Sequence, residues 1–273
     1  MKLSKSFIEQ LGELNLISES SNLELKSSVK TIKIDVGCAS GHLMAQWLET
    51  DEGLFAVGIE PNPNSLKTAK ELLSENYGPE GVRWVVLSGA LGPAEASLRF
   101  FVPNESPDQG SLLHPENPKQ VLSFEVHVEP LSNLLSILLS GGILNVDFLK
   151  TDCQGLDLEV LKSGGQQLQH VKVITSEADS EGYLGATNSI QAMDNYLVGL
   201  GFTHTNKRSS VRRLAGGFLH KIKLGPILGL RLPNFSKGRK LQGAGINTQD
   251  PTFVNHRFKD QVLAGYVRAF QEG

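Results

Sequence analysis

The sequence is poor in cysteine and has no long apolar run. Its 273 residues include two cysteines, Cys38 and Cys153, which are too few for a disulfide framework or for the paired spacing of a zinc site. The most apolar stretch, 131–146, is broken by polar residues and by two adjacent glycines, and is too short to cross a bilayer. His, Asp and Glu also do not recur at ligand spacing, so we expect no metal site. We expect the two cysteines to be small buried thiols, with a redox pair as the alternative, in a reducing, cytoplasmic environment.

Strong charge of either sign is also missing. The formal net charge is −3, which by itself indicates neither a nucleic acid nor a membrane as a partner. Apolar residues near the start, including Phe7 and Leu11, have helical spacing, and polar residues between them interrupt the apolar core that a signal peptide needs. We therefore expect residues 1–28 to form a helical extension and 29–273 to form one α/β domain, for which the length and the 40% hydrophobic content are sufficient.

The most informative stretch is residues 33–42, Lys-Ile-Asp-Val-Gly-Cys-Ala-Ser-Gly-His. A β-branched run leads into glycines and then into an amphipathic segment, which predicts a strand, a tight turn and a helix. Gly37 has no Cβ, so backbone at that turn can approach a ligand closely. Three residues separate Gly37 from Gly41, and Asp35 precedes Gly37 by two positions, so the spacing differs from that of the dinucleotide fingerprint.

A second acid follows at the end of the next apolar run. Residues 56–63 read Ala-Val-Gly-Ile-Glu-Pro-Asn-Pro, and Glu60 stands about twenty residues after the turn, where a ribose-binding carboxylate is expected. The two segments together resemble motif I and the acidic loop of class I S-adenosylmethionine-dependent methyltransferases. This resemblance implies S-adenosylmethionine as the cofactor, with NAD or a purely structural turn as the alternatives. The residues it implies for cofactor binding here are Asp35, Gly37, Cys38, Gly41, Glu60, Pro61 and Asn62.

The remaining pattern alternates strands and helices. Strands are expected near 31–36, 54–59 and 82–88, with helices near 41–49 and 63–75. Such repeating units predict a doubly wound α/β fold, and the resemblance implies a mostly parallel, seven-stranded, Rossmann-like sheet. Residues 94–128 break the pattern and predict a short β excursion, with a polar loop over 103–119 near the active face.

A later strand, 146–152, ends at Asp152 and is followed by an expected helix over 156–162. Ligands of doubly wound sheets bind at the carboxyl ends of the strands where the strand order reverses. We therefore expect the turns after Val36 and Asp152 to face the same crevice.

Residues 150–164, Lys-Thr-Asp-Cys-Gln-Gly-Leu-Asp-Leu-Glu-Val-Leu-Lys-Ser-Gly, together with Gly-Ile-Glu-Pro-Asn-Pro at 58–63, resemble motifs of the FkbM family of methyltransferases. Weaker similarity covers 126–135, where Pro130 and Asn133 depart from the family pattern, and also 173–177 and 250–255. Most members of that family are assigned to O-methylation. The resemblance, over about 30–205 and 249–257, implies methyl transfer to a hydroxyl of a small molecule, a sugar or a glycolipid.

Two carboxyl groups are the catalytic candidates. Methyl transfer is a displacement, so positioning of the acceptor matters, and a hydroxyl acceptor must also lose a proton. Asp152 is the first candidate, either as the proton acceptor or as a ligand of the methionine ammonium, and Glu177 at the tip of the next strand is the second. The alternatives are that Asp152 caps the helix near Leu156 and that Glu177 is a charge at the rim.

Further candidates lie in loops. Ser88 and Ala90 follow the third strand, where this fold usually meets the adenine. Asp108 and His114 can reach an acceptor if the polar loop closes over the site. Tyr183 lies where the family often has an aromatic residue. We expect it either to line the acceptor pocket or to lie on the surface.

The stretch 206–249 holds ten lysines and arginines and no acid, and it predicts a basic insertion before the last strand. Such an insertion suits the binding of an anionic acceptor or a peripheral contact with a lipid surface. The alternative is a solvated loop without a binding role. Nucleic acid is the less favoured partner because no RNA-binding motif or series of aromatic residues accompanies the charge. RNA or protein methylation and a non-catalytic binding module remain the alternative functions. Residues 258–270 predict a closing helix, and the oligomeric state stays open.

Overall fold

The structure is a computed structural model that describes residues 5–178, 182–205 and 250–262. The expected basic insertion over 206–249 lies outside these residues. Most of the expected closing helix over 258–270 lies outside them as well. Neither prediction is therefore tested here.

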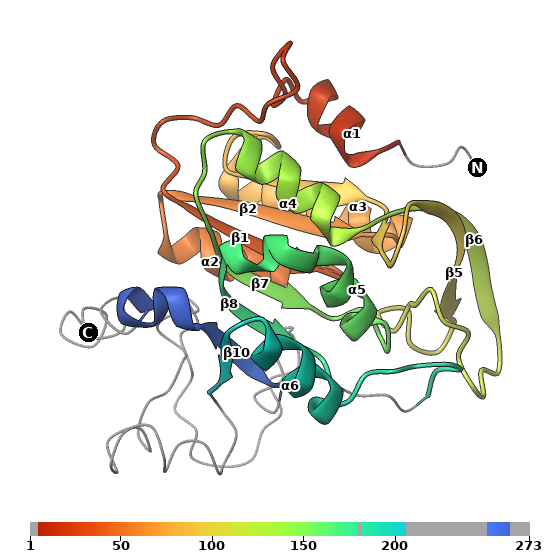
Figure 1. Ribbon diagram of the computed structural model, residues 1–273. Coiled ribbons are helices and arrows are strands. Elements are labelled where there is room, and N and C mark those ends of the chain that lie inside the picture. Colours follow the sequence, from red (N-terminus) through yellow and green to blue (C-terminus); the bar gives the residue numbers. More distant parts are fainter. Residues whose placement is uncertain (1–4, 179–181, 206–249, 263–273) are drawn as a thin grey trace, which may run out of the picture.

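Seven strands form one central sheet with the order β3-β2-β1-β7-β8-β10-β9 (Figure 1). Its strands are β1 (Thr31–Val36), β2 (Leu54–Glu60), β3 (Trp84–Ser88), β7 (Val146–Thr151), β8 (Val171–Ser176), β9 (Phe202–His204) and β10 (Thr252–Asn255). Neighbouring strands are parallel except that β10 runs antiparallel to both β8 and β9. The predicted doubly wound, mostly parallel, seven-stranded fold is confirmed.

Helices cover both faces of this sheet. They are α1 (Phe7–Glu13), α2 (His42–Thr50), α3 (Pro63–Tyr77), α4 (Leu131–Ser140), α5 (Asp157–Gly164) and α6 (Ile190–Gly199), with short 3₁₀ turns at Gly165–His170 and His256–Phe258. Local chemistry explains where they begin. Before α3, the Asn62 side chain accepts the backbone N–H of Asn64, and Pro63 fills the first helical position. Ser6 and Glu9 form a reciprocal capping box at α1.

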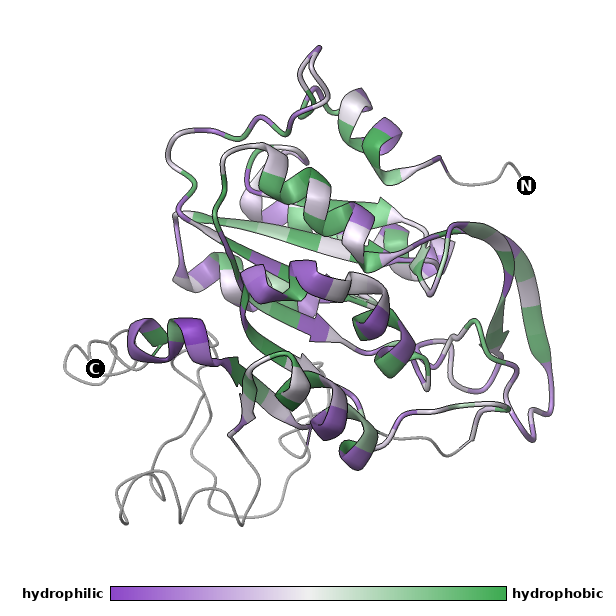
Figure 2. Cartoon of the chain, viewed as in Figure 1, coloured by the Kyte–Doolittle hydropathy of each residue, from purple (hydrophilic) through white to green (hydrophobic). Residues whose placement is uncertain are grey.

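Alternate strand residues supply two apolar layers. Side chains such as Ile34, Val57 and Leu149 pack on the face covered by α1, α4, α5 and α6. Their neighbours Ala56 and Phe148 pack on the opposite face, with α2 and α3. Because side chains of a strand alternate between its faces, a strand buried on both sides must be apolar nearly throughout. Figure 2 shows hydrophobic residues along the central strands, interrupted by hydrophilic ones.

The predicted excursion between β3 and β7 is a separate three-stranded sheet. Its strands are β4 (Ala90–Leu91), β5 (Ala96–Pro103) and β6 (Val121–Glu129); β5 pairs antiparallel and β4 parallel with β6. In Figure 1 the β5–β6 ribbon stands at one side of the central sheet. The loop between β5 and β6 folds back, and two isolated β-bridges hold it, one joining Phe101 to Ser111 and one joining Pro115 to Tyr183.

The N-terminal helix α1 is attached to the edge of the sheet. Phe7 and Leu11 are buried. The Gln10 side chain exchanges two hydrogen bonds of 2.8 Å with the backbone N–H and carbonyl of Ser88. Gln10 thus takes the place of a neighbouring strand beside β3, which is an edge strand. Within the described ranges, no helix is both long and apolar enough to span a membrane.

Candidate functional site

The strand order reverses between β1 and β7, and a cavity of about 250 Å³ opens at the carboxyl ends of β1, β2 and β7. Its lining includes Asp35, Gly37, Cys38, Glu60, Pro61, Asn62, Ala90 and Asp152, all of which the sequence had indicated. The turns after Val36 and Asp152 therefore face one crevice, as expected. Pro107, Asp108 and Gly110, from the loop after β5, also line the cavity.

Two residues predicted to bind the cofactor, Gly41 and Ser88, are not among the described residues that line the cavity, although Ser40 and His42 on either side of Gly41 are. Gly41 precedes α2, has a φ of 77°, and a Cβ added there would lie 3.1 Å from the Cβ of Ala69. It therefore serves the close approach of α2 to α3. The backbone of Ser88 is engaged by Gln10, so the position after β3 that reaches the cavity is Ala90.

The first turn depends on Gly37. Its φ is 75°, and a Cβ added there would lie 2.1 Å from the carbonyl oxygen of Asp152. The Gly37 N–H donates to the Ile59 carbonyl, and the Asp152 N–H donates to the Val36 carbonyl, at 3.0 Å each. The ends of three strands therefore meet at a point where only hydrogen fits.

Both turns also carry a non-glycine residue in the left-handed region. Ala39 has a φ of 47° and Gln154 a φ of 51°. Residues with a Cβ seldom adopt this conformation, and such strain concentrates at functional sites. The two strained positions line the same cavity.

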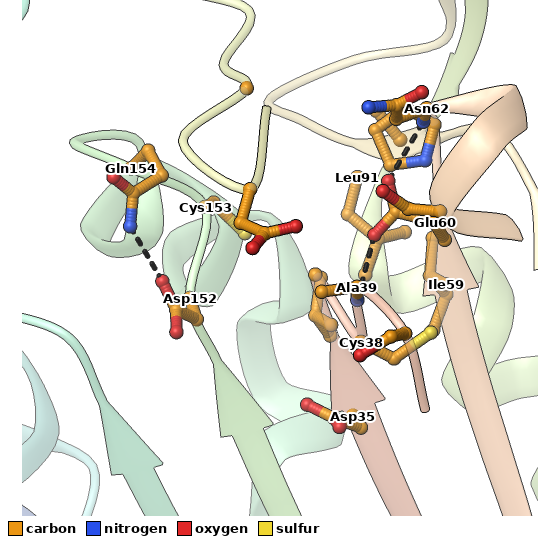
Figure 3. A pocket seen from close by; sticks show the side chains of 18 of the residues that line it. Asp35, Cys38, Ala39, Ile59, Glu60, Asn62, Leu91, Asp152, Cys153 and Gln154 are labelled. Atoms are coloured by element: carbon orange, nitrogen blue, oxygen red, sulfur yellow. Dashed lines mark hydrogen bonds between the residues drawn. The ribbon is translucent and has the colours of Figure 1, made fainter. Parts of the chain in front are cut away.

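The Glu60 carboxylate organises one wall (Figure 3). One oxygen accepts the Ala39 N–H and the other accepts the Asn62 N–H, each at 2.8 Å. Burial raises the pKa of Glu60 to about 7, although these two N–H donors act to lower it. A carboxylate offers about four acceptor positions, so both oxygens can accept further hydrogen bonds from a ligand.

The opposite wall contains a buried lysine between two carboxylates. The Nζ of Lys150 lies 3.2 Å from an oxygen of Asp35 and 3.2 Å from an oxygen of Asp152. Burial alone would lower the pKa of Lys150, but the two carboxylates outweigh it and raise that pKa. The Asp152 side chain is 30% exposed and that of Asp35 only 2%. Asp152 is therefore the accessible member of the group.

Asp152 does not cap α5. The Asp157 carboxylate accepts the Cys153 N–H at 2.9 Å, whereas the second oxygen of Asp152 accepts the side-chain amide of Gln154 at 2.8 Å (Figure 3). The helix-capping alternative for Asp152 is therefore wrong. The reason is that Asp157, the first residue of α5, supplies the carboxylate that accepts the backbone N–H in the turn before the helix.

Glu177 lies outside the cavity but is joined to it through Gln154. The Gln154 amide nitrogen donates to Asp152 and, at 3.0 Å, to Glu177. Burial, followed by the charge of Asp152, raises the pKa of Glu177 to about 9. Glu177 therefore carries its proton at neutral pH. The Tyr183 hydroxyl lies 3.1 Å from the amide oxygen of Gln154.

Lys150 and Gln154 stand within the motif at 150–164, and no role was predicted for either of them. The available signal for Lys150 was a lysine inside an otherwise apolar strand, which must find a countercharge when buried. Nothing comparable identified Gln154. His114 does not line the cavity; its ring packs edge-on against Phe101, with the centroids 4.9 Å apart.

The two cysteines are reduced thiols. Burial raises the pKa of both Cys38 and Cys153, so neither is a ready nucleophile. Over residues 5–178, 182–205 and 250–262, no group of three His, Cys, Asp or Glu side chains is placed to hold a metal ion.

Comparison with known proteins gives a family match over residues 35–204, described as the methyltransferase FkbM domain. No curated protein matches the chain. Among solved structures, FkbM from Methylobacillus flagellatus KT is 18% identical, with a TM-score of 0.42, over 71% of this chain and 44% of that protein. TrmK of M. capricolum and the N-terminal domain of human METTL16, both in complex with S-adenosylhomocysteine, are each 14% identical with TM-scores of 0.35.

These two alignments cover 74% and 72% of this chain and 60% and 61% of the respective proteins. The chain thus spans less than two thirds of each of these solved structures. The family match covers more than half of the chain and includes both turns of the cavity. The chain therefore belongs to the FkbM family of S-adenosylmethionine-dependent methyltransferases.

Proposed function

We propose that this protein methylates a hydroxyl oxygen of a small molecule, a sugar or a glycolipid. The observation that carries the proposal is the placement of two carboxyl groups on one cavity. Glu60 is the last residue of β2, and Asp152 directly follows β7. The first suits a ribose and the second suits a reacting hydroxyl.

The residues present fit S-adenosylmethionine. Glu60 has lone pairs left to accept the ribose hydroxyls, and the turn at Gly37 is free of any side chain that would hold a ligand away. Ala90 and Leu91 add an apolar surface to the same cavity, which suits an adenine. When bound, the cofactor supplies a methyl group on a positively charged sulfur, and the sulfur keeps the electron pair when that methyl is displaced.

Asp152 is the residue we assign to the acceptor proton. As the hydroxyl oxygen forms its bond to carbon, its proton passes to the Asp152 carboxylate, and the electron pair of the broken O–H bond stays on oxygen. Lys150 and the Gln154 amide hold the two Asp152 oxygens in place. Glu177 is protonated at neutral pH, so it is unsuited to accept a proton there.

The test is transfer of an isotopically labelled methyl group from S-adenosylmethionine to a panel of hydroxylated acceptors. Calorimetric titration with S-adenosylhomocysteine and with NAD accompanies it. We expect micromolar binding of the adenosyl compound, no binding of NAD, and label recovered in a methyl ether. Label recovered only in RNA or protein, or cofactor binding without transfer to any acceptor, would overturn the proposal.

Glu60→Gln should weaken the affinity for S-adenosylhomocysteine by about 1–3 kcal/mol, the scale of a hydrogen bond to a charged group. The glutamine keeps one acceptor oxygen, so its NH₂ must face either the Ala39 N–H or the Asn62 N–H, which are both donors. Isothermal titration measures the change. Glu9→Gln is the control, because one oxygen of Glu9 accepts both the backbone N–H and the hydroxyl of Ser6, and the amide oxygen of a glutamine can replace it. Equal affinity in wild type and Glu60→Gln would reject the ribose assignment.

The raised pKa of Glu177 has a consequence for stability. The folded state holds this proton up to about pH 9, whereas the unfolded chain releases it near the ordinary value of 4.5. The contribution of Glu177 to the free energy of unfolding is thus fully present below 4.5 and declines as pH rises toward 9, with a slope of at most about 1.4 kcal/mol per pH unit.

Glu177→Gln removes this titration, so its stability relative to wild type should increase from pH 5 to pH 9. Urea unfolding of both proteins at pH 5, 7 and 9 measures the difference, and contributions from groups that do not interact with Glu177, Glu60 included, cancel in it. A difference that is constant with pH would show that Glu177 is ionised in the folded protein.

A further inference from the structure

A second space adjoins the cofactor cavity, and we propose that it is the acceptor site and that the acceptor is an uncharged, polyhydroxylated molecule such as a neutral sugar. The inference rests on the proposed function, because it assigns the substrate class of the same reaction. The space is a groove of about 530 Å³ formed by the loop after β5 and by the segment around Tyr183. We refer to it as the side groove.

The side groove has walls that are tied together. Pro115 and Tyr183 form an antiparallel bridge. The Glu116 N–H donates to the Gly182 carbonyl, and the Leu184 N–H donates to the His114 carbonyl, at 2.9 Å each. The Tyr183 hydroxyl also lies 2.8 Å from the Gln109 carbonyl oxygen. Segments 114–116 and 182–184, far apart in the sequence, are therefore held as one surface.

The side groove leads to the reacting end of the cavity. Gln154 lines both spaces, and its amide contacts Asp152 on the cavity side and Glu177 on the groove side. Glu177 lines the groove, whereas Asp152 lines the cavity on the other side of the Gln154 side chain. In the proposed complex, a hydroxyl of a molecule in the groove passes Gln154 to meet Asp152, while the rest of the molecule stays outside the cofactor cavity.

The lining has the chemistry that a sugar requires. Side-chain amides offer both donors and acceptors to hydroxyl groups. The ring of Tyr183 and several prolines offer apolar surfaces against which the C–H faces of a pyranose can pack. The amides are Gln109, Asn117, Gln120 and Gln154, and the prolines are Pro103, Pro115 and Pro118.

The charges of the lining disfavour an anion. Glu105 is paired with Lys119 at 3.3 Å. Among the described residues that line the side groove, Lys119 is the only lysine or arginine. Glu116 adds a negative charge, and Glu177 is a neutral donor at pH 7 that becomes negative if it loses its proton. A phosphate or carboxylate on the acceptor would meet like charge. The anionic acceptor suggested by the basic insertion is therefore not the one that this groove favours.

The experiment compares matched acceptors. Methyl glycosides of common hexoses are each tested beside the corresponding uronic acid and 6-phosphate, with labelled S-adenosylmethionine as donor. Binding of the same probes to protein saturated with S-adenosylhomocysteine is followed by saturation-transfer NMR. We expect at least one neutral glycoside to bind and to be methylated with a kcat/KM about tenfold or more above those of its acidic partners.

Variants locate the site. Tyr183→Ala should lower kcat/KM for the glycoside about tenfold or more without changing the affinity for S-adenosylhomocysteine, and Glu116→Lys should narrow the preference for the neutral partner. Leu184→Ala is the control, because Leu184 is 57% exposed and does not line the side groove. Preference for the acidic partners, absence of binding by every sugar, or indifference to both variants would overturn the inference. Methylation of a hydroxyl on an anionic molecule would leave the proposed function standing, whereas failure to bind S-adenosylhomocysteine would reject that function itself.

Discussion

Replacing Asp152 by asparagine should lower kcat for methyl transfer by about 100- to 10,000-fold, the usual contribution of a general base. The amide cannot accept the acceptor proton, yet it has nearly the shape of the carboxyl group and can still accept from the Gln154 side chain. Lys150 remains paired with Asp35 at 3.2 Å, so the wall of the cavity is retained. Affinity for S-adenosylhomocysteine should therefore fall much less than the rate, as measured by single-turnover kinetics and by isothermal titration.

Glu177→Gln is the matched control for this substitution. Gln154 separates the two carboxyl groups, but Glu177 is protonated at neutral pH, and a glutamine keeps it neutral. We therefore expect most of the activity to survive in Glu177→Gln at pH 7. If Asp152→Asn loses cofactor binding and rate by the same factor, Asp152 is a ligand of the cofactor. If Glu177→Gln loses the larger share of the rate, the proton acceptor is Glu177.

Gly37→Ala should destabilise the fold by about 3 kcal/mol or more and weaken S-adenosylhomocysteine binding, because two costs coincide at this position. The added Cβ lies 2.1 Å from the Asp152 carbonyl oxygen, far inside van der Waals contact, and the φ of 75° is unfavourable for any residue with a Cβ. Relief requires β1 and β7 to separate at the end that lines the cavity. Urea unfolding and isothermal titration measure the two effects.

Gly142→Ala separates the two costs. Gly142 has a φ of 78°, close to that of Gly37, but an added Cβ meets nothing within 4 Å. It should lose only the backbone preference, about 1–2 kcal/mol, and should not change cofactor affinity. Similar losses of stability in the two variants would mean that the turn at Gly37 can move to accommodate a methyl group. The close approach of Gly37 to the Asp152 carbonyl would then not be required.

Most elements of the central sheet could be predicted because their signals are local. Apolar runs ending in Gly, Pro or Asn predicted β1, β2 and the helices after them, with bounds that agree to within a few residues. Glu60 was predicted as a site residue because it ends a buried strand at the expected distance from the glycine turn. Its second role, holding Ala39 and Asn62, depends on the path of the turn and had no signal.

Other parts of the site depend on contacts between distant segments. Gly41 and Ser88 fitted the cofactor pattern, but one faces α3 and the other is engaged by Gln10 of α1. No spacing in the sequence contains these contacts, because they arise when separate elements pack.

The sequence by itself determined the fold class, the glycine turn and the two acids, Glu60 and Asp152, at the ends of their strands. Hydrophobic periodicity and turn chemistry act over a few residues, and such properties can be read along the chain. Tertiary structure alone decided that Lys150 lies between Asp35 and Asp152, and that Gln154 joins Asp152 to Glu177 and Tyr183. These groups meet because parallel strands in register bring their carboxyl ends to one edge, and burial there then determines which carboxyl group keeps its proton.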